Sequence, residues 1–128
     1  MRSLRDAGMR VGTHGMHHVP WRRLDAATAA RELHEARGVL TEVLGAPVTE
    51  AACPFGEYDR RALALLRKAG YDAVYTSDRR AAPVRGWLQP RYTARRQDTA
   101  ESLRREVLEG GLAHRAVREA VGVVKRWR

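Results

Sequence analysis

Cysteine, lysine and long apolar stretches are nearly absent from this sequence of 128 residues. The single cysteine, Cys53, excludes an internal disulfide framework and any zinc finger built from several cysteines. No apolar run approaches the length of about 18 residues that a membrane-spanning helix needs, and the first residues lack the apolar block of a signal peptide. Taken as written, the chain is expected to be soluble, untargeted and cytoplasmic, although no residue identifies its compartment.

The charge of the chain is strongly one-sided. Its 22 arginines and two lysines outnumber 15 acidic residues, which gives a net charge of +9. Basic side chains are densest in residues 91–128, where ten of them accompany five acidic ones. Such a segment is either a solvated surface or a binding surface for an acidic polymer, and both interpretations stay open.

Strand and helix patterns alternate through the first part of the chain. The predicted elements are a helix end over residues 3–7, a strand over 9–13, a helix over 25–45, a strand over 48–53, a helix over 59–70 and a strand over 71–76. This alternation predicts parallel pairing and an α/β fold, with functional loops at the carboxyl ends of the strands.

The remainder of the chain is less regular. Residues 78–97 predict an irregular segment with a brief strand near Trp87–Tyr92. Asp98–Glu101 predicts a capping box for a helix that ends at Glu109, and spaced apolar residues predict a last helix over 113–124. We therefore divide the chain into an α/β part, residues 1–97, and a helical segment, residues 98–128, packed on it.

Two histidines four residues apart follow the first predicted strand. Neutral imidazole is a common zinc ligand, and one short loop can bring His14 and His18 to the same ion. His17 neighbours this pair but points elsewhere because it is adjacent to His18. By itself the spacing is also compatible with surface or hydrogen-bonded histidines.

A second loop, Pro54-Phe55-Gly56, follows the second predicted strand. Proline restricts its backbone and glycine opens it, so the loop can direct a peptide N–H toward a ligand oxygen. An ordinary strand-to-helix turn would have the same composition.

Several linked motifs in residues 1–78 resemble the polysaccharide deacetylase family, the family-four carbohydrate esterases. The motifs occur in unbroken order at residues 8–18, 25–45, 51–59 and 68–71. The resemblance implies a distorted, TIM-like (β/α) barrel, of which residues 1–97 would be the C-terminal part. It also implies that a divalent metal, usually zinc, assists hydrolysis of N-acetyl or O-acetyl groups on carbohydrate.

The resemblance also implies a set of site residues. His14 and His18 match the two metal-binding histidines of the family's H-[ST]-x-x-H motif, and Gly15 replaces the hydroxyl residue. The backbone N–H of Phe55 would stabilise the oxyanion. The expected substrate contacts are Pro54, Gly56, Tyr58 and Trp87. Trp21 and Trp87 are also candidates for stacking on a sugar ring, although tryptophan more often packs in a core.

The chain departs from the family pattern at three points. The arginine of the family's R-P-P-Y-G loop is missing, because Ala52 and Cys53 precede Pro54. The late leucine-x-histidine motif, source of the general acid, matches only the letters of Leu112-Ala-His114. The family's two aspartates, the third metal ligand and the catalytic base, would lie upstream of Met1, so we interpret the chain as N-terminally truncated.

Asp78 is the only aspartate considered as a replacement, since Asp25 and Asp59 are better explained as helix caps. We therefore expect a zinc-dependent carbohydrate deacetylase whose activity is small or absent in this chain alone. Its partner would be an acetylated amino-sugar polymer or oligomer, with no nucleic acid. A second copy or a missing N-terminal portion would cover the open barrel edge. The alternative is a non-catalytic binding or regulatory module whose basic C-terminal segment holds acidic polymers.

Overall fold

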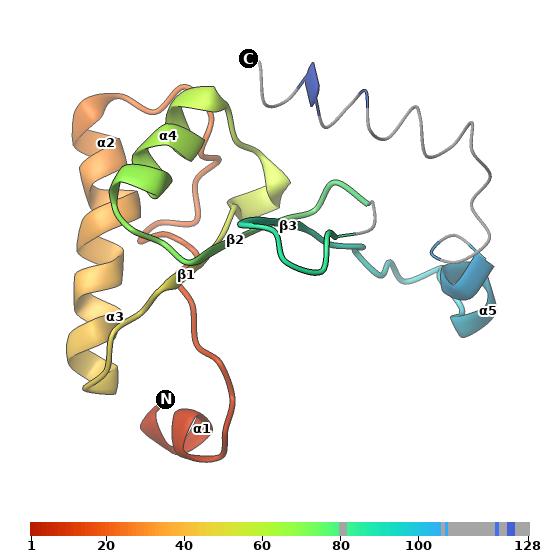
Figure 1. The fold of residues 1–128 in the computed structure, drawn as a ribbon, viewed down its shortest axis with the longest axis horizontal. Helices are drawn as coiled ribbons and strands as arrows, with labels where there is room; N and C mark the ends of the chain where they lie inside the picture. The colour runs from red at the N-terminus through yellow and green to blue at the C-terminus, as the bar shows by residue number, and fades with distance from the viewer. Residues whose placement is uncertain (80–81, 106, 108–119, 121–122, 125–128) are drawn as a thin grey trace.

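The computed structural model describes residues 1–79, 82–105, 107, 120, 123 and 124. Over these residues the chain is an α/β protein with a parallel sheet in the order β1, β2, β3 (Figure 1). The strands are β1, Glu50–Ala52, β2, Ala73–Thr76, and β3, Leu88–Pro90. The predicted α/β class and parallel pairing are confirmed, while the described strands form an open sheet and not a closed barrel.

The strand predicted at Met9–Thr13 is reduced to a single bridge. Thr13 pairs in parallel with Ala51, its N–H donating to the Glu50 carbonyl at 2.9 Å and its carbonyl accepting from Ala52 at 2.9 Å. Gly12 is needed for this approach, because a Cβ there would lie 2.9 Å from the Glu50 carbonyl oxygen. The bridge still carries the chain to the carboxyl edge of the sheet, where His14 follows.

The helix predicted from Asp25 to Gly45 is present, with one irregularity. It runs through α2, Ala26–Ala30, then a π-helical turn η1, Arg31–Glu35, and α3, Ala36–Leu44. As predicted, the Asp25 side chain caps it by accepting from the Thr28 N–H at 2.8 Å. Gly45 ends it at φ 65°. The π-helical turn was not predicted, and it frees backbone carbonyls from the usual ladder.

The Leu33 carbonyl in this turn accepts a hydrogen bond from another part of the chain. The Tyr71 hydroxyl donates to it at 2.7 Å. The Arg37 guanidinium lies 4.6 Å from the centroid of the Tyr71 ring. Burial raises the pKa of Tyr71 to about 12, although the Arg37 charge opposes this.

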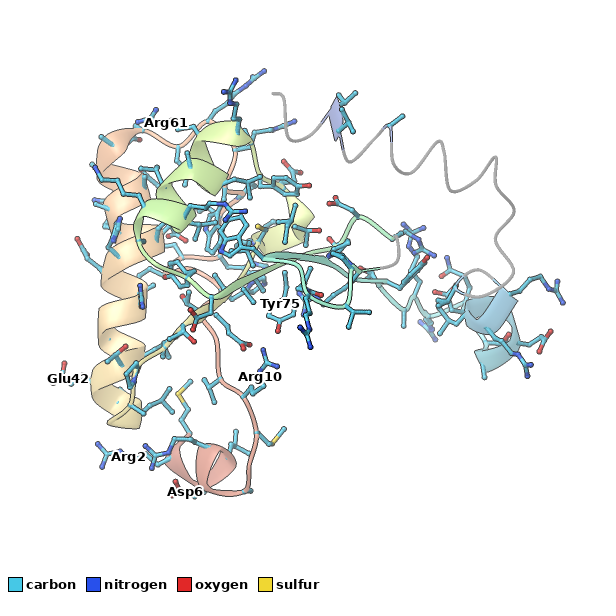
Figure 2. The ribbon with its side chains drawn as sticks, in the orientation of Figure 1. Arg2, Asp6, Arg10, Glu42, Arg61 and Tyr75 are labelled. Carbon is cyan, nitrogen blue, oxygen red and sulfur yellow. The ribbon has the colours of Figure 1, made fainter. Side chains whose placement is uncertain are left out.

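Helix α4, Arg60–Lys68, begins as predicted at the cap Asp59, whose side chain accepts from the Ala62 N–H at 2.8 Å. It packs with the α2–α3 helix on one face of the sheet. The core between them consists of Trp21, Ala29, Leu33, Ala51, Cys53, Tyr58, Ala62, Leu66, Tyr71 and Val74. Arg10 and Tyr75 lie on the side of the sheet away from α4 (Figure 2). Alternation along the strands thus gives the sheet one helix-covered face.

The remaining described helices are α1, Arg2–Asp6, the 3₁₀ turn η2, Pro54–Gly56, and α5, Ala100–Arg104. The capping box of α5 was predicted one residue too early. Thr99 and Ser102 form it, not Asp98 and Glu101. The candidate His114 lies outside the described residues, as does the predicted helix over 113–124 apart from residues 120, 123 and 124. No described helix is both long enough and apolar enough to span a membrane.

Candidate functional site

The two histidines singled out by their spacing meet at the carboxyl edge of the sheet. His14 Nδ1 lies 2.7 Å from the Ala52 carbonyl oxygen, at the end of β1. A carbonyl oxygen only accepts, so Nδ1 carries the donated proton and Nε2 of the neutral ring keeps its lone pair. That Nε2 lies 3.2 Å from the Nε2 of His18. The two rings therefore converge through nitrogen atoms that can share a proton or a cation.

This spacing is suited to a divalent ion. Two imidazole nitrogens bound to one tetrahedral zinc ion, each about 2.0–2.1 Å away, would lie about 3.3 Å apart. The observed 3.2 Å fits that geometry. Within the described part of the chain, however, no group of three or more His, Cys, Asp or Glu side chains forms a site for a metal. Two such nitrogens are one fewer than the three protein ligands that catalytic zinc usually has.

The turn after β1 lies against this pair. Phe55 is 62% exposed, and its ring centroid is 4.5 Å from that of His18. Phe55 has a left-handed backbone, with φ 56° and ψ 6°, which is costly for a residue other than glycine. Its N–H donates to no acceptor among the described residues. Strain and an available donor together mark this turn as a place where a ligand oxygen can be held.

The other residues predicted on this loop lie beneath its surface. Pro54 and Gly56 are buried. A Cβ on Gly56 would collide with the Ser77 side chain, so only glycine fits against that neighbour. Tyr58 is 1% exposed, and its hydroxyl donates to Asp78 Oδ2 at 2.7 Å. These positions show how the turn is supported, whereas the predicted contacts with substrate stay a prediction.

Asp78 does not join the histidines. Its carboxylate accepts from Tyr58 and also from the Thr76 hydroxyl at 2.8 Å, and it is buried. Asp25 and Asp59 cap helices as predicted, and Asp59 also accepts from the Arg23 N–H at 2.7 Å. The structure therefore does not support Asp78 as a replacement for the missing metal ligand.

Both tryptophans considered for sugar stacking instead contact other parts of the chain. Trp21 is 0% exposed and belongs to the core. The Trp87 indole N–H donates to the Tyr71 carbonyl at 2.7 Å, and the Arg67 guanidinium lies 4.3 Å from a Trp87 ring centroid. Tyr71 precedes β2, so Trp87 lies at the amino edge of the sheet, opposite the histidine pair. The structure thus does not bring Trp87 to the candidate site.

Sequence reasoning overlooked Glu32. This glutamate, 0% exposed, accepts from the Met16 N–H at 3.1 Å and the His17 N–H at 2.9 Å. Its Oε1 also lies 3.1 Å from His17 Nδ1. The available signal was its spacing, because Glu32 lies three residues after Ala29 and four before Ala36, on the buried stripe of the helix.

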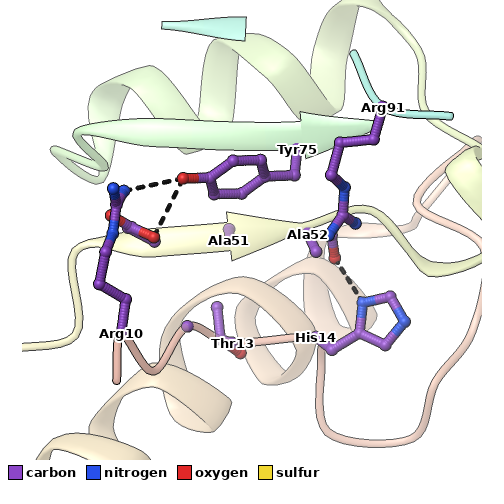
Figure 3. A pocket seen from close by; sticks show the side chains of 9 residues that line it. Arg10, Thr13, His14, Ala51, Ala52, Tyr75 and Arg91 are labelled. Atoms are coloured by element: carbon purple, nitrogen blue, oxygen red, sulfur yellow. Dashed lines mark hydrogen bonds and ion pairs between the residues drawn. The ribbon is translucent and has the colours of Figure 1, made fainter. Parts of the chain in front are cut away.

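An open cavity of about 380 Å³ adjoins His14 on the uncovered face of the sheet. Figure 3 shows Arg10 and Tyr75 at one end of it and Arg91 and His14 at the other. Arg10 contacts Glu50 and donates to the Tyr75 hydroxyl at 2.8 Å, and the Arg91 guanidinium lies 5.1 Å from the Tyr75 ring centroid. Arg10, Arg91 and Glu50 give the cavity charged groups, which can form hydrogen bonds with an oxygen-rich ligand.

The fold is similar to that of solved structures of deacetylases. The deacetylase PplD of Streptococcus pyogenes in complex with acetate is 18% identical with a TM-score of 0.70, over 84% of this chain and 48% of that chain. BC0361, a polysaccharide deacetylase from Bacillus cereus, is 20% identical with a TM-score of 0.65, over 82% of this chain and 34% of that one. The chain thus spans about a third to a half of the length of these structures.

Comparison with curated proteins finds no match. The polysaccharide deacetylase family model matches residues 1–74. This match covers more than half of the chain and includes the histidine pair and the Phe55 turn. The chain therefore belongs to the polysaccharide deacetylase family.

Proposed function

We propose that this chain provides two metal ligands and the oxyanion donor of a hydrolase that removes acetyl groups from N-acetylated carbohydrate. The observation that carries the proposal is the 3.2 Å approach of the His14 and His18 Nε2 atoms beside the exposed Phe55 turn. Membership of the polysaccharide deacetylase family supports the reaction class. The substrate would be an acetylated amino-sugar polymer or oligomer.

His14 and His18 would hold zinc, or another divalent ion, through their Nε2 atoms. When bound, the ion would supply a Lewis acid that polarises the acetyl carbonyl and acidifies water. The hydrogen bond from His14 Nδ1 to Ala52 keeps that ring in the tautomer and orientation that a ligand needs. The Phe55 ring packs against the His18 ring.

Phe55 would stabilise the negative oxygen that forms when the acetyl carbonyl is attacked. A backbone N–H already held in place loses little freedom when the charge develops, which makes it an efficient donor. Because the side chain does not donate, Phe55→Tyr is expected to leave this role intact. Proline at this position removes the N–H and would abolish it.

We further propose that this chain alone releases little or no acetate. Hydrolysis needs a carboxylate or similar base to take a proton from water, and the described residues place no such group with the histidine pair. The matched deacetylase structures are also two to three times longer than the part that this chain covers.

Zinc titration of the purified chain tests the metal site directly. Wild type is expected to bind zinc at micromolar concentration, and His14→Ala and His18→Ala are each expected to lose that binding. His34→Ala is the matched control, because His34 is an exposed histidine on the helix and not on the loop of the pair. Failure of the wild-type chain to bind micromolar zinc would contradict the proposal.

Acetate release from chitooligosaccharides with added zinc or cobalt tests the activity of the chain alone. We expect no more than trace release. Robust turnover that His14→Ala abolishes would show that the chain holds a complete catalytic set, and would refute the expectation of an incomplete one.

A further inference from the structure

The loop that joins the two histidines is tightly folded around one buried carboxylate. Gly15 has φ 84° and His18 has φ 56°, so left-handed residues bracket Met16 and His17. The N–H groups of Met16 and His17 both donate to Glu32. The two amides that reverse the chain between the histidines are therefore held by a single side chain.

Glu32 lies in the π-helical turn η1. In η1, Glu32 and its neighbour Leu33 are both buried, so a polar and an apolar side chain face inward side by side. The Glu32 carboxylate occupies the space beside Gly15, where an added Cβ would collide with it and lie 3.3 Å from the Trp21 indole nitrogen. The carboxylate is thus packed in place and not merely near the loop.

The left-handed backbone of His18 needs this kind of support. A residue other than glycine adopts positive φ only when its surroundings hold it there. Glu32 makes two hydrogen bonds to the preceding backbone and lies 3.1 Å from the His17 ring nitrogen. The carboxylate is thus hydrogen-bonded to the residue directly before His18, whose Nε2 lies 3.2 Å from that of His14.

We infer that Glu32 is a positioning residue that holds the His14–His18 loop in its ion-binding conformation. It touches neither Nε2 atom and acts through the Met16 and His17 amides. This inference rests on the proposed function for its consequence, tighter metal binding, but the loop conformation itself is open to measurement without any metal.

The test compares Glu32→Gln with Glu35→Gln, the same change at an exposed position of the same helix. The glutamine amide has one oxygen and one NH₂ group, so its NH₂ would face either the Met16 or the His17 N–H. Two donors cannot form a hydrogen bond, so one of the two bonds to the loop is lost. Loss of a group that orients metal ligands typically lowers metal affinity about 10–100-fold. We expect a loss of that size in Glu32→Gln and none in Glu35→Gln, measured by chelator competition at a temperature where both are folded.

Amide hydrogen exchange gives a second, metal-free reading. Wild type and Glu35→Gln are expected to protect the Met16 and His17 amides, and Glu32→Gln to lose that protection while the amides of α4 stay protected. Unchanged zinc affinity or unchanged Met16 and His17 protection in folded Glu32→Gln would overturn the inference. A wild-type chain that binds no zinc would instead refute the proposed function, and the exchange result would still decide the role in the loop.

Glu32→Asp covers the case in which Glu32→Gln does not fold. It keeps the charge but shortens the side chain by one methylene. It therefore separates the effect of a buried negative charge from the effect of a side chain long enough to contact the Met16 and His17 amides. The inference is supported if Glu32→Asp shows weaker zinc binding and weaker amide protection than wild type and Glu35→Gln, without losing either completely. Wild-type values for both measurements would overturn it.

Discussion

The same substitution, glycine to alanine, is expected to have opposite effects on stability at Gly15 and at Gly38. Gly15 has φ 84°, and an added Cβ would collide with Glu32. Left-handed backbone costs a residue with a Cβ about 1–2 kcal/mol, before the collision is counted. Gly38 lies within α3 with no atom within 4 Å of an added Cβ, so alanine there is expected to gain roughly 0.5–1 kcal/mol.

Urea unfolding of the two variants checks this reasoning. Their free energies of unfolding are expected to move in opposite directions and to differ by at least about 1.5 kcal/mol. For a chain of this size, each kcal/mol corresponds to roughly 3–5 °C in melting temperature. Gly15→Ala is also expected to weaken zinc binding, whereas Gly38→Ala leaves it unchanged. Equal shifts of the same sign would refute the left-handed, Glu32-packed loop.

Three further changes probe the core and the Phe55 turn. Burial raises the pKa of Tyr71 to about 12, so stability is complete below about pH 10 and falls as the pH rises toward 12. Tyr71→Phe is expected to remove that alkaline loss in urea titrations between pH 8 and 11; a loss that persists would refute the assignment to Tyr71. Leu66→Ala empties a fully buried position and is expected to cost about 2–5 kcal/mol in urea unfolding, whereas a cost below about 1 kcal/mol would contradict its place in the core. Gly56→Ala adds a collision with Ser77 to left-handed strain, so its melting temperature should fall below that of Gly70→Ala, which has the strain at φ 72° but open space; equal melting temperatures would exclude the collision.

Local signals predicted most of the architecture because their causes are local. Asp25 and Asp59 can each accept a hydrogen bond from a backbone N–H three residues later, and both cap helices in the structure. Gly45 ends its helix at positive φ, as expected of a residue without a Cβ. Parallel pairing followed from the alternation of strands and helices, although each strand proved shorter than its apolar run.

Position along the chain was a poor guide wherever a side chain has a distant partner. Trp87 was predicted to contact substrate, but its indole N–H donates to the Tyr71 carbonyl at the other edge of the sheet. Asp78 follows a strand as a catalytic aspartate would, but it accepts hydrogen bonds from Tyr58 and Thr76. Such pairings depend on which strands become neighbours, and short-range patterns carry no information about that.

By itself the sequence determined that two imidazoles lie four residues apart on one loop after a strand, because spacing and glycine position are properties of the chain. Only the tertiary structure decided that their Nε2 atoms face each other at 3.2 Å. That convergence depends on the Ala52 carbonyl from β1 and the Glu32 carboxylate from η1, two elements that only folding brings to the loop. Glu32 was not singled out from the sequence, because its hydrogen bonds to the Met16 and His17 amides arise only when the helix packs against the loop.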